Sequence, residues 1–415
     1  MVRCPGGFGR APLMSYSSEW RCARLETMFE VYVHVPFCLR RCGYCDFNTY
    51  TARDLGNGAS REGYAHQAIQ EMRLVRQWQL DHGLDEGPVS TVFLGGGTPT
   101  ILTPSNLAAM VQAIDGIWGI EAGAEITTEA NPDTVDADYI QALADAGFTR
   151  ISFGMQSAVP HVLHTLDRTH TPANVEAGIN AANRAGLRSS VDLIYGTPGE
   201  SLDDWRTSVK TAIALGVNHI SAYALTVEPT TTMGRRIAAG VLPKPDDDDE
   251  AAKYDIADTL LTQAGFDWYE VSNWAKPGYE SRHNLGYWRN VDWAGIGPGA
   301  HSHYGDVQGS AVRAWDITHP KVWAQAINEG RVPFAGSETI SATEQAEEQL
   351  MLGLRIREGL DIAQADARIP QAAWRQFADE GLLDPRALNE GRAVPTRRGR
   401  LLNDAMIMQL MEYIS

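Results

Sequence analysis

Residues 31–47 read VYVHVPFCLRRCGYCDF, and this stretch decides the fold class. A run of β-branched residues ends in a short loop that carries Cys38, Cys42 and Cys45 with the spacing C-x3-C-x2-C. The whole chain has 5 cysteines, so three within one loop are not scattered core thiols. Three thiolates on one loop can bind three irons of a cubane cluster and leave the fourth iron open to another molecule.

Disulfides and a zinc site are the two other uses that three clustered cysteines allow. Disulfides are disfavoured, because a tight loop with an odd cysteine makes a poor framework and nothing indicates secretion. A zinc site stays open as the alternative, since His34 would complete a Cys3His ligand set. Cys4 and Cys22 stand apart in the N-terminal segment, and we take them as incidental.

The bulk properties indicate a soluble protein of two or three domains. The chain has 415 residues and a formal net charge of −17, which argues against binding to nucleic acid or to an anionic membrane. No apolar run approaches the roughly 20 residues that span a bilayer, so we expect no integral membrane segment and a cytoplasmic protein. Residues 1–28 show no periodicity and no apolar stretch of a secretory signal, and we expect a disordered tail there.

From residue 29 onward, β-branched runs alternate with helical patterns that end in glycine. This alternation predicts parallel β/α architecture with right-handed crossovers, and six units are too few for a complete eight-stranded barrel. The expected strands are Val31–Val35, Thr91–Leu94, Glu125–Thr128, Arg150–Phe153, Ser190–Ile194 and His219–Tyr223. The expected helices are Ser105–Ile117, Asp136–Ala146, Pro172–Ala185 and Leu202–Leu215.

Polar and glycine residues follow these strands where each strand ends. The carboxyl ends of parallel strands meet at one rim, where β/α barrels carry their chemistry, so we expect these residues to lie together. Glycines allow the backbone to approach a ligand and offer N–H groups to a carboxylate, and carboxylates accept hydrogen bonds from hydroxyl or ammonium groups. The rim residues are the cysteine loop, Gly95–Thr100, Glu129, Gly154–Gln156, Asp192, the segment 195–199 and Thr226.

The sequence from Val31 onward resembles the coproporphyrinogen-dehydrogenase-like branch of the radical S-adenosylmethionine (SAM) superfamily. The motifs that carry the resemblance are YVHVPFC, GGGTPT, EANP, ISFGMQ and DLIYGTP. The resemblance implies an α/β fold with an open, partial (β/α)6 barrel, a [4Fe–4S] cluster on Cys38, Cys42 and Cys45, and SAM at the rim. The residues implied to contact SAM are Tyr32, Tyr44, Gly96, Gly97, Thr98, Glu129, Gln156, Arg168, Asp192 and Thr226.

Two features separate the subfamilies of this branch. The oxygen-independent coproporphyrinogen III dehydrogenases carry a fourth cysteine two residues after the third, where this chain has Phe47. The motifs CGYCDFNTY and HNLGYW instead resemble the HemW family of haem chaperones. That resemblance implies haem as a ligand and haem-requiring respiratory proteins as recipients, with a homodimer as an open question. The alternatives are a true dehydrogenase and a radical SAM enzyme with another substrate.

Residues 266–304 are rich in groups that could hold haem, whose iron takes an imidazole, thiolate or phenolate ligand. His283 is the leading candidate because it belongs to the HNLGYW motif, although an interior structural role is the plainer explanation for any one of these residues. The candidates are Trp268, Tyr269, Trp274, His283, Tyr287, Trp288, Trp293, His301, His303 and Tyr304.

The expected domains are residues 29–240 as the partial barrel, 241–340 as an α+β extension and 341–415 as a small winged-helix-like domain. The last domain is predicted from helical patterns at Ala342–Ile356, Gln371–Asp379 and Arg397–Met411, with a short ribbon between the last two. Winged helices often bind DNA, but the chain has no basic stripe, so we interpret this domain as a substrate cover or a docking module.

Overall fold

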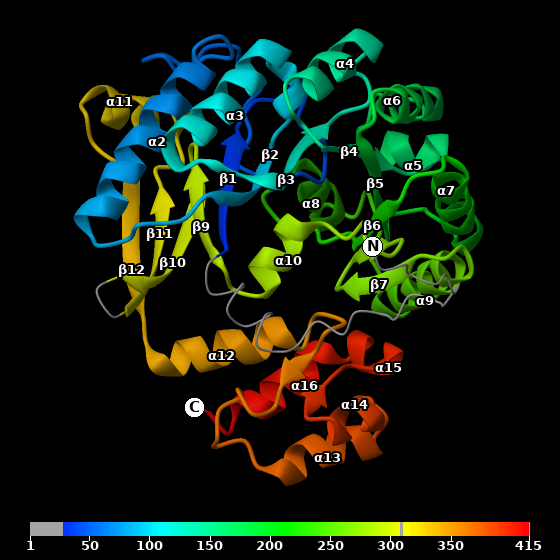
Figure 1. Ribbon diagram of the computed structural model, residues 1–415. Coiled ribbons are helices and arrows are strands. Elements are labelled where there is room, and N and C mark those ends of the chain that lie inside the picture. Colours follow the sequence, from blue (N-terminus) through cyan, green and yellow to red (C-terminus); the bar gives the residue numbers. More distant parts are fainter. Residues whose placement is uncertain (1–27, 308–309, 415) are drawn as a thin grey trace, which may run out of the picture.

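The structure is a computed structural model that describes residues 28–307 and 310–414, so the predictions for the tail, Cys4 and Cys22 lie outside the described residues. The described strands form one twelve-stranded sheet and a two-stranded ribbon (Figure 1). In spatial order the sheet contains β12 (Phe334–Ile340), β11 (Ser310–Asp316), β10 (His301–Val307), β9 (Asp292–Ile296), β1 (Phe29–Val35), β2 (Val89–Gly96), β3 (Ile120–Ala130), β4 (Arg150–Gln156), β5 (Arg188–Tyr195), β6 (His219–Ala224), β8 (Asn273–Ala275) and β7 (Asp267–Glu270).

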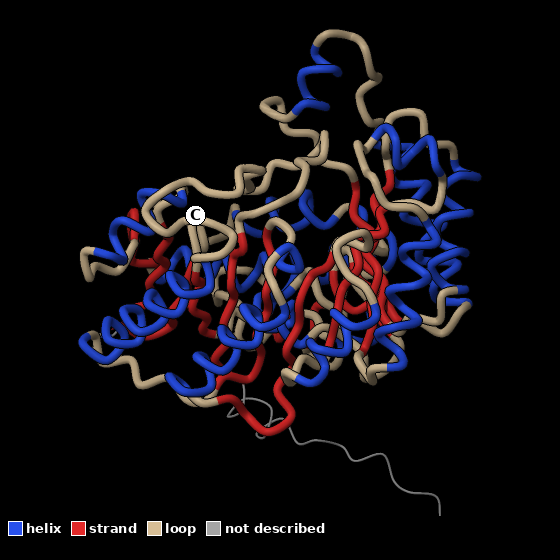
Figure 2. Tube along the Cα trace, turned by 90° about the horizontal axis from the view of Figure 1, so that it is seen from above, coloured by secondary structure: helices blue, strands red, loops and turns tan. Residues whose placement is uncertain are grey.

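Strands β1 to β6 are parallel to one another and form the partial barrel, so the predicted fold class is confirmed. Each expected strand lies within an observed one, and helices line the outside of the strand layer (Figure 2). These helices are α2 (Tyr64–Asp81), α3 (Pro104–Trp118), α4 (Ala137–Asp145), α5 (Pro160–Thr165), α6 (Pro172–Arg184) and α7 (Leu202–Ala214), with the 3-10 turn η1 (Pro99–Ile101) after β2.

Local sequence signals explain where the barrel helices begin. Thr103, Asp136, Thr171 and Ser201 each accept a backbone N–H three residues further on, which satisfies one of the unpaired donors of a helix N-terminus. Pro104 and Pro172 occupy the first turn, where a missing N–H costs nothing. These caps fix where each helix begins. They therefore also fix the position of the residues at the C-terminal end of the strand before it.

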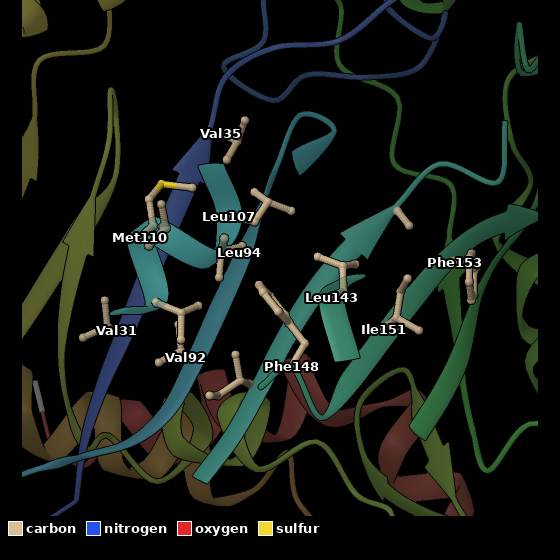
Figure 3. Packing of buried hydrophobic residues seen from close by; sticks show 14 of the residues in the cluster. Val31, Val35, Val92, Leu94, Leu107, Met110, Leu143, Phe148, Ile151 and Phe153 are labelled. Atoms are coloured by element: carbon tan, nitrogen blue, oxygen red, sulfur yellow. The ribbon is translucent and has the colours of Figure 1, made fainter. Parts of the chain in front are cut away.

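A continuous apolar core joins the barrel strands to the helices. Strand β1 is buried along almost its whole length, as parallel strands covered on both faces are. Figure 3 shows part of this core, in which helix α3 packs on the strands. The labelled side chains are Val31, Val35, Val92, Leu94, Leu107, Met110, Leu143, Phe148, Ile151 and Phe153.

The region after β6 extends the sheet at both ends. Strand β9 pairs in parallel with β1 and is followed by the antiparallel strands β10 to β12, while β8 pairs antiparallel with β6 at the other end. The acidic run at Asp246 begins a helix, and the Asp246 side chain accepts the Asp249 N–H at its N-terminus. The helices of this region are α8 (Thr232–Ala238), α9 (Asp247–Gln263), α10 (Arg282–Trp288) and α11 (Pro320–Asn328).

The C-terminal residues form a small domain with an apolar core of its own, which includes Leu354, Trp374 and Phe377. It lies below the sheet in Figure 1 and begins with α12. Its elements are α12 (Ala342–Gly353), β13 (Leu360–Asp361), α13 (Gln371–Asp379), α14 (Pro385–Asn389), β14 (Arg392–Ala393), α15 (Arg397–Leu401) and α16 (Asn403–Met411). The prediction of one helix over Arg397–Met411 was wrong, because the chain breaks at Leu402.

In the described part of the chain, no helix is long and apolar enough to cross a bilayer.

Candidate functional site

A cavity of about 530 Å³ opens where strands β1 to β6 end. Its volume falls in the range of about 300–1,000 Å³ that is usual for small-molecule sites. The cavity brings together every residue predicted to bind the cluster or SAM except Tyr32, and the predicted haem ligand His283 also lies outside it. The predicted residues that line it are Cys38, Cys42, Tyr44, Cys45, Gly96, Gly97, Thr98, Glu129, Gln156, Arg168, Asp192 and Thr226.

The cysteine loop is held by backbone contacts on both sides. Cys38 N–H donates to the Tyr50 carbonyl at 3.0 Å, and the Arg61 guanidinium donates to the Cys38 carbonyl at 2.9 Å. Arg168 Nη1 donates to Cys42 Sγ at 3.4 Å. Burial raises the pKa of the Cys38 and Cys45 thiols, so a positively charged partner is needed to hold these sulfurs as thiolates.

The glycine run after β2 allows that loop to rest on the cysteine loop. A Cβ atom at Gly97 would lie 2.6 Å from the Phe37 carbonyl oxygen and 3.1 Å from Cys38 Sγ. The N–H groups of Gly97 and Thr98 donate to the Val35 and Phe37 carbonyls, each at 2.8 Å. The prediction that this run offers free N–H groups to a ligand carboxylate is therefore wrong for these two residues.

The residues present fit an iron–sulfur cluster better than a single zinc ion. His34 uses Nε2 on the Asn48 carbonyl and Nδ1 on the Tyr32 hydroxyl, each at 3.0 Å, so it does not join the cysteines. Among the described residues, no three potential ligand side chains surround one metal-ion position. Three thiolates that each bind a different iron need not converge on one point.

Two half-buried carboxyl groups, those of Glu129 and Asp192, lie on the barrel wall of the cavity. Burial and the neighbouring Asp192 raise the pKa of Glu129 to about 8, and burial also raises the pKa of Asp192. Gly96 N–H donates to Glu129 at 3.1 Å, and the Ser152 hydroxyl donates to Asp192 at 3.0 Å. Both groups can accept further hydrogen bonds from hydroxyl or ammonium groups of a ligand.

The end of β4 has an unusual backbone that places Gln156 on the cavity wall. Gln156 has φ 60, in the left-handed region that non-glycine residues seldom occupy and that recurs at functional sites. Arg168 donates to the Gly154 carbonyl at 2.9 Å and to Asn131 Oδ1 at 2.8 Å. The Arg168 guanidinium therefore contacts both the Gln156 turn and Cys42.

The sequence reasoning missed Arg150, whose side chain lines the cavity although it begins a predicted strand. Its guanidinium is buried and donates to Ser190 Oγ at 2.9 Å. A charged residue at the start of a strand expected to be buried was the signal that could have identified it.

A second cavity of about 640 Å³ adjoins the first and shares Phe47, Gly96 and Glu129 with it. It contains Tyr32 and several of the aromatic and histidine candidates of residues 266–304. These candidates are Tyr287, Trp293, His301 and His303. Trp268, Tyr269 and Trp274 instead lie on β7 and β8 at the other end of the sheet.

His283 lines neither cavity. Its ring is 1% exposed and stacks on Phe93 with centroids 5.1 Å apart. Nδ1 is 2.7 Å from Thr91 Oγ1, and Nε2 is 2.8 Å from the Tyr287 hydroxyl. Burial lowers the pKa of His283 to about 3, so the ring is neutral. Both ring nitrogens are engaged, which leaves neither available to a haem iron in this structure, so this geometry argues against the leading haem-ligand prediction.

A partial parallel barrel whose rim gathers three cysteines, two half-buried carboxyl groups and a glycine loop is the arrangement of a radical SAM protein. Residues 32–212 match the radical SAM superfamily, and residues 340–402 match the HemN C-terminal domain. The chain belongs to the HemW family of that superfamily.

The relatives that show this membership cover most of both chains. The chain is 44% identical over 384 residues to "Heme chaperone HemW" of Mycobacterium tuberculosis, covering 92% of this chain and 95% of that one. It is 32% identical to the Bacillus subtilis protein of the same name, over 91% and 97% of the two chains. The structure also matches coproporphyrinogen III oxidase (HemN) from Escherichia coli with a TM-score of 0.76 over 94% and 91% of the chains, at 23% identity.

Proposed function

We propose that the protein is a haem chaperone that binds haem and delivers it to haem-requiring proteins, among them respiratory enzymes. The observation that carries the proposal is the 44% identity over 92% of the chain to a protein named heme chaperone. The oxidase that shares the fold is only 23% identical. Free cysteine thiols need a reducing compartment, so we place the activity in the cytoplasm.

In this proposal the first cavity holds a [4Fe–4S] cluster on Cys38, Cys42 and Cys45, with SAM beside it. When bound, the cluster supplies an open iron that can take the amino and carboxylate groups of SAM. The protein's own contribution is electrostatic: Arg168 donates to Cys42 Sγ and offsets the negative charge of the thiolates. Glu129 and Asp192 would accept hydrogen bonds from the hydroxyl and ammonium groups of SAM.

The alternative function is oxidative decarboxylation of coproporphyrinogen III. The shared fold and the cavity at the rim favour it. Phe47 opposes it, because the dehydrogenases carry a cysteine at that position, and a phenyl ring cannot replace a thiol as a ligand or hydrogen donor.

One anaerobic preparation of cluster-loaded protein tests both functions. Haemin is titrated into the protein, and the complex is then mixed with a haem-free haem-requiring acceptor whose absorbance reports transfer. In parallel, the reduced protein is incubated with SAM and coproporphyrinogen III. We expect haemin binding, transfer and no decarboxylated product. Protoporphyrinogen formation, or failure to bind haemin, would overturn the proposal.

A further inference from the structure

The second cavity lies between one face of the sheet extension and the first helix of the C-terminal domain. Strands β9 to β11 supply one wall, β1 and α10 supply another, and α12 closes the space from the C-terminal domain. The apolar and aromatic residues of these walls are Tyr32, Phe47, Tyr287, Trp293, Ala300, Met351 and Leu352. Such walls suit a flat, largely apolar ligand of the size that the volume admits.

Sheet register places two histidines on this face. His301 and His303 are two residues apart on β10, so their side chains share one face. Across the strands, His303 is opposite Trp293 on β9 and Arg313 on β11, and His301 is opposite Trp315. On this face the cavity is lined by the Trp293 indole and by the imidazoles of His301 and His303.

The two imidazoles differ in access. The residue His303 is 2% exposed, and its ring stacks on Trp293 with centroids 5.0 Å apart. Both of its ring nitrogens are buried away from solvent. The His301 side chain is exposed and contacts the Trp315 ring at a centroid distance of 6.2 Å. Among the described residues, no hydrogen bond or ion pair engages the His301 ring nitrogens. His301 is thus the imidazole that a ligand in this cavity can reach.

The backbone of His301 is held firmly. Trp293 Nε1 donates to the His301 carbonyl at 2.9 Å, and a side chain at Gly295 would collide with that same carbonyl. A metal ligand on a fixed strand keeps its orientation when the ligand arrives, which lowers the entropic cost of binding.

We propose that haem binds in the second cavity with the His301 imidazole as an axial ligand of its iron. The proposal rests on the proposed function, because it names the place where the proposed cargo is held. Neutral imidazole is a common haem ligand, and the aromatic walls would pack on the porphyrin. The shared residues Phe47, Gly96 and Glu129 place this haem directly beside the cavity that carries the cysteines.

Arg313 supplies the positive charge that haem propionates require. Its side chain lines the cavity, is 37% exposed, and pairs with Glu338 at 3.0 Å and with Glu348 of α12 at 2.6 Å. A propionate can compete with Glu348 for this guanidinium. The orientation that follows has the propionates toward α12 and the iron toward His301.

The test is a titration of haemin into the cluster-loaded full-length protein, carried out on the wild type and on His301→Ala. Binding is read from the Soret band, and the axial ligand from resonance Raman and low-temperature electron paramagnetic resonance spectra. His66→Ala is the matched control, since His66 is exposed on α2 and lines neither cavity. Leu352→Trp is a second variant, which fills the cavity from α12.

We expect His301→Ala to lose the histidine-ligand spectrum and to bind haemin at least about tenfold more weakly, with free imidazole restoring the ligand spectrum. Leu352→Trp should weaken binding while iron and sulfide content stay unchanged, and His66→Ala should behave as wild type. An unchanged ligand spectrum and affinity in His301→Ala would overturn this site but leave the chaperone function standing. Failure of the wild type to bind haemin would instead overturn the proposed function.

Discussion

Replacing Gly97 with alanine should displace the cysteine loop and reduce cluster loading. The added Cβ would lie 2.6 Å from the Phe37 carbonyl oxygen, 2.8 Å from the Val35 carbonyl oxygen and 3.1 Å from Cys38 Sγ. Two of these neighbours are backbone atoms, which cannot turn aside as a flexible side chain can. Either the glycine loop or the cysteine loop must therefore move.

The size of the effect follows from these contacts. Forcing one extra methyl group into a packed site costs about 1–3 kcal/mol. Separating the loops also lengthens the bonds from Gly97 N–H to the Val35 carbonyl and from Thr98 N–H to the Phe37 carbonyl, now 2.8 Å each. Each such bond contributes about 0.5–1.5 kcal/mol. We therefore expect a lower urea midpoint and fewer irons per chain after reconstitution.

Gly116→Ala is the matched control for this change. Gly116 lies in the interior of α3, and a Cβ atom there meets nothing within 4 Å. Alanine should stabilise that helix by about 0.5–1 kcal/mol without affecting iron content. If Gly97→Ala loads as much iron as wild type and unfolds at the same urea concentration, the close packing of the two loops is not what holds the cysteines.

Three further changes test the site. Cys42→Ala should leave a folded barrel that lacks the visible absorbance and the iron of the cluster; an unchanged iron content would contradict the ligand assignment. Glu129 has a folded-state pKa of about 8 against an ordinary value of 4.5, so between these pH values the folded state keeps a proton that the unfolded state has released. The free energy of unfolding therefore falls as the pH rises from 4.5 to about 8. Glu129→Gln should flatten that fall, which urea titrations at pH 5 and pH 8 would measure. His283→Ala leaves the hydroxyls of Thr91 and Tyr287 unpaired in the interior, so it should lower stability by about 1–3 kcal/mol while iron content and the haem-ligand spectrum stay unchanged. Loss of that spectrum without loss of stability would restore His283 as the haem ligand.

The barrel and most of its rim were predictable because the signals are local. Each strand is a short β-branched run that passes into a capped helix, and parallel strands necessarily end at one rim. Glu129 and Asp192 are far apart in sequence, yet both line one cavity because their strands point the same way. The spacing of the three cysteines directly after the first strand predicted that their loop lies at the same rim.

The arrangement of the extension could not be read from the sequence, because local patterns do not say which strand lies beside which. Strand β9 joins β1, whereas β8 joins β6, so the aromatic residues of one segment separate to opposite ends of the sheet. Trp274 becomes buried at one end and Trp293 lines a cavity at the other. His283 shows the same limit, since motif membership does not distinguish a ligand from a buried packing residue.

Phe47 lines both cavities and bears on the choice between the chaperone and the dehydrogenase functions. It follows the third cysteine by two residues, is 59% exposed and lines both cavities. A cysteine there would place a reactive, ionisable group at the boundary, in keeping with the chemistry of the decarboxylating enzymes. A phenyl ring cannot exchange protons or bind a metal, but it offers an apolar face to a flat ligand. The substitution therefore weakens the case for catalysis at this boundary and strengthens the case that the second cavity holds a porphyrin as cargo.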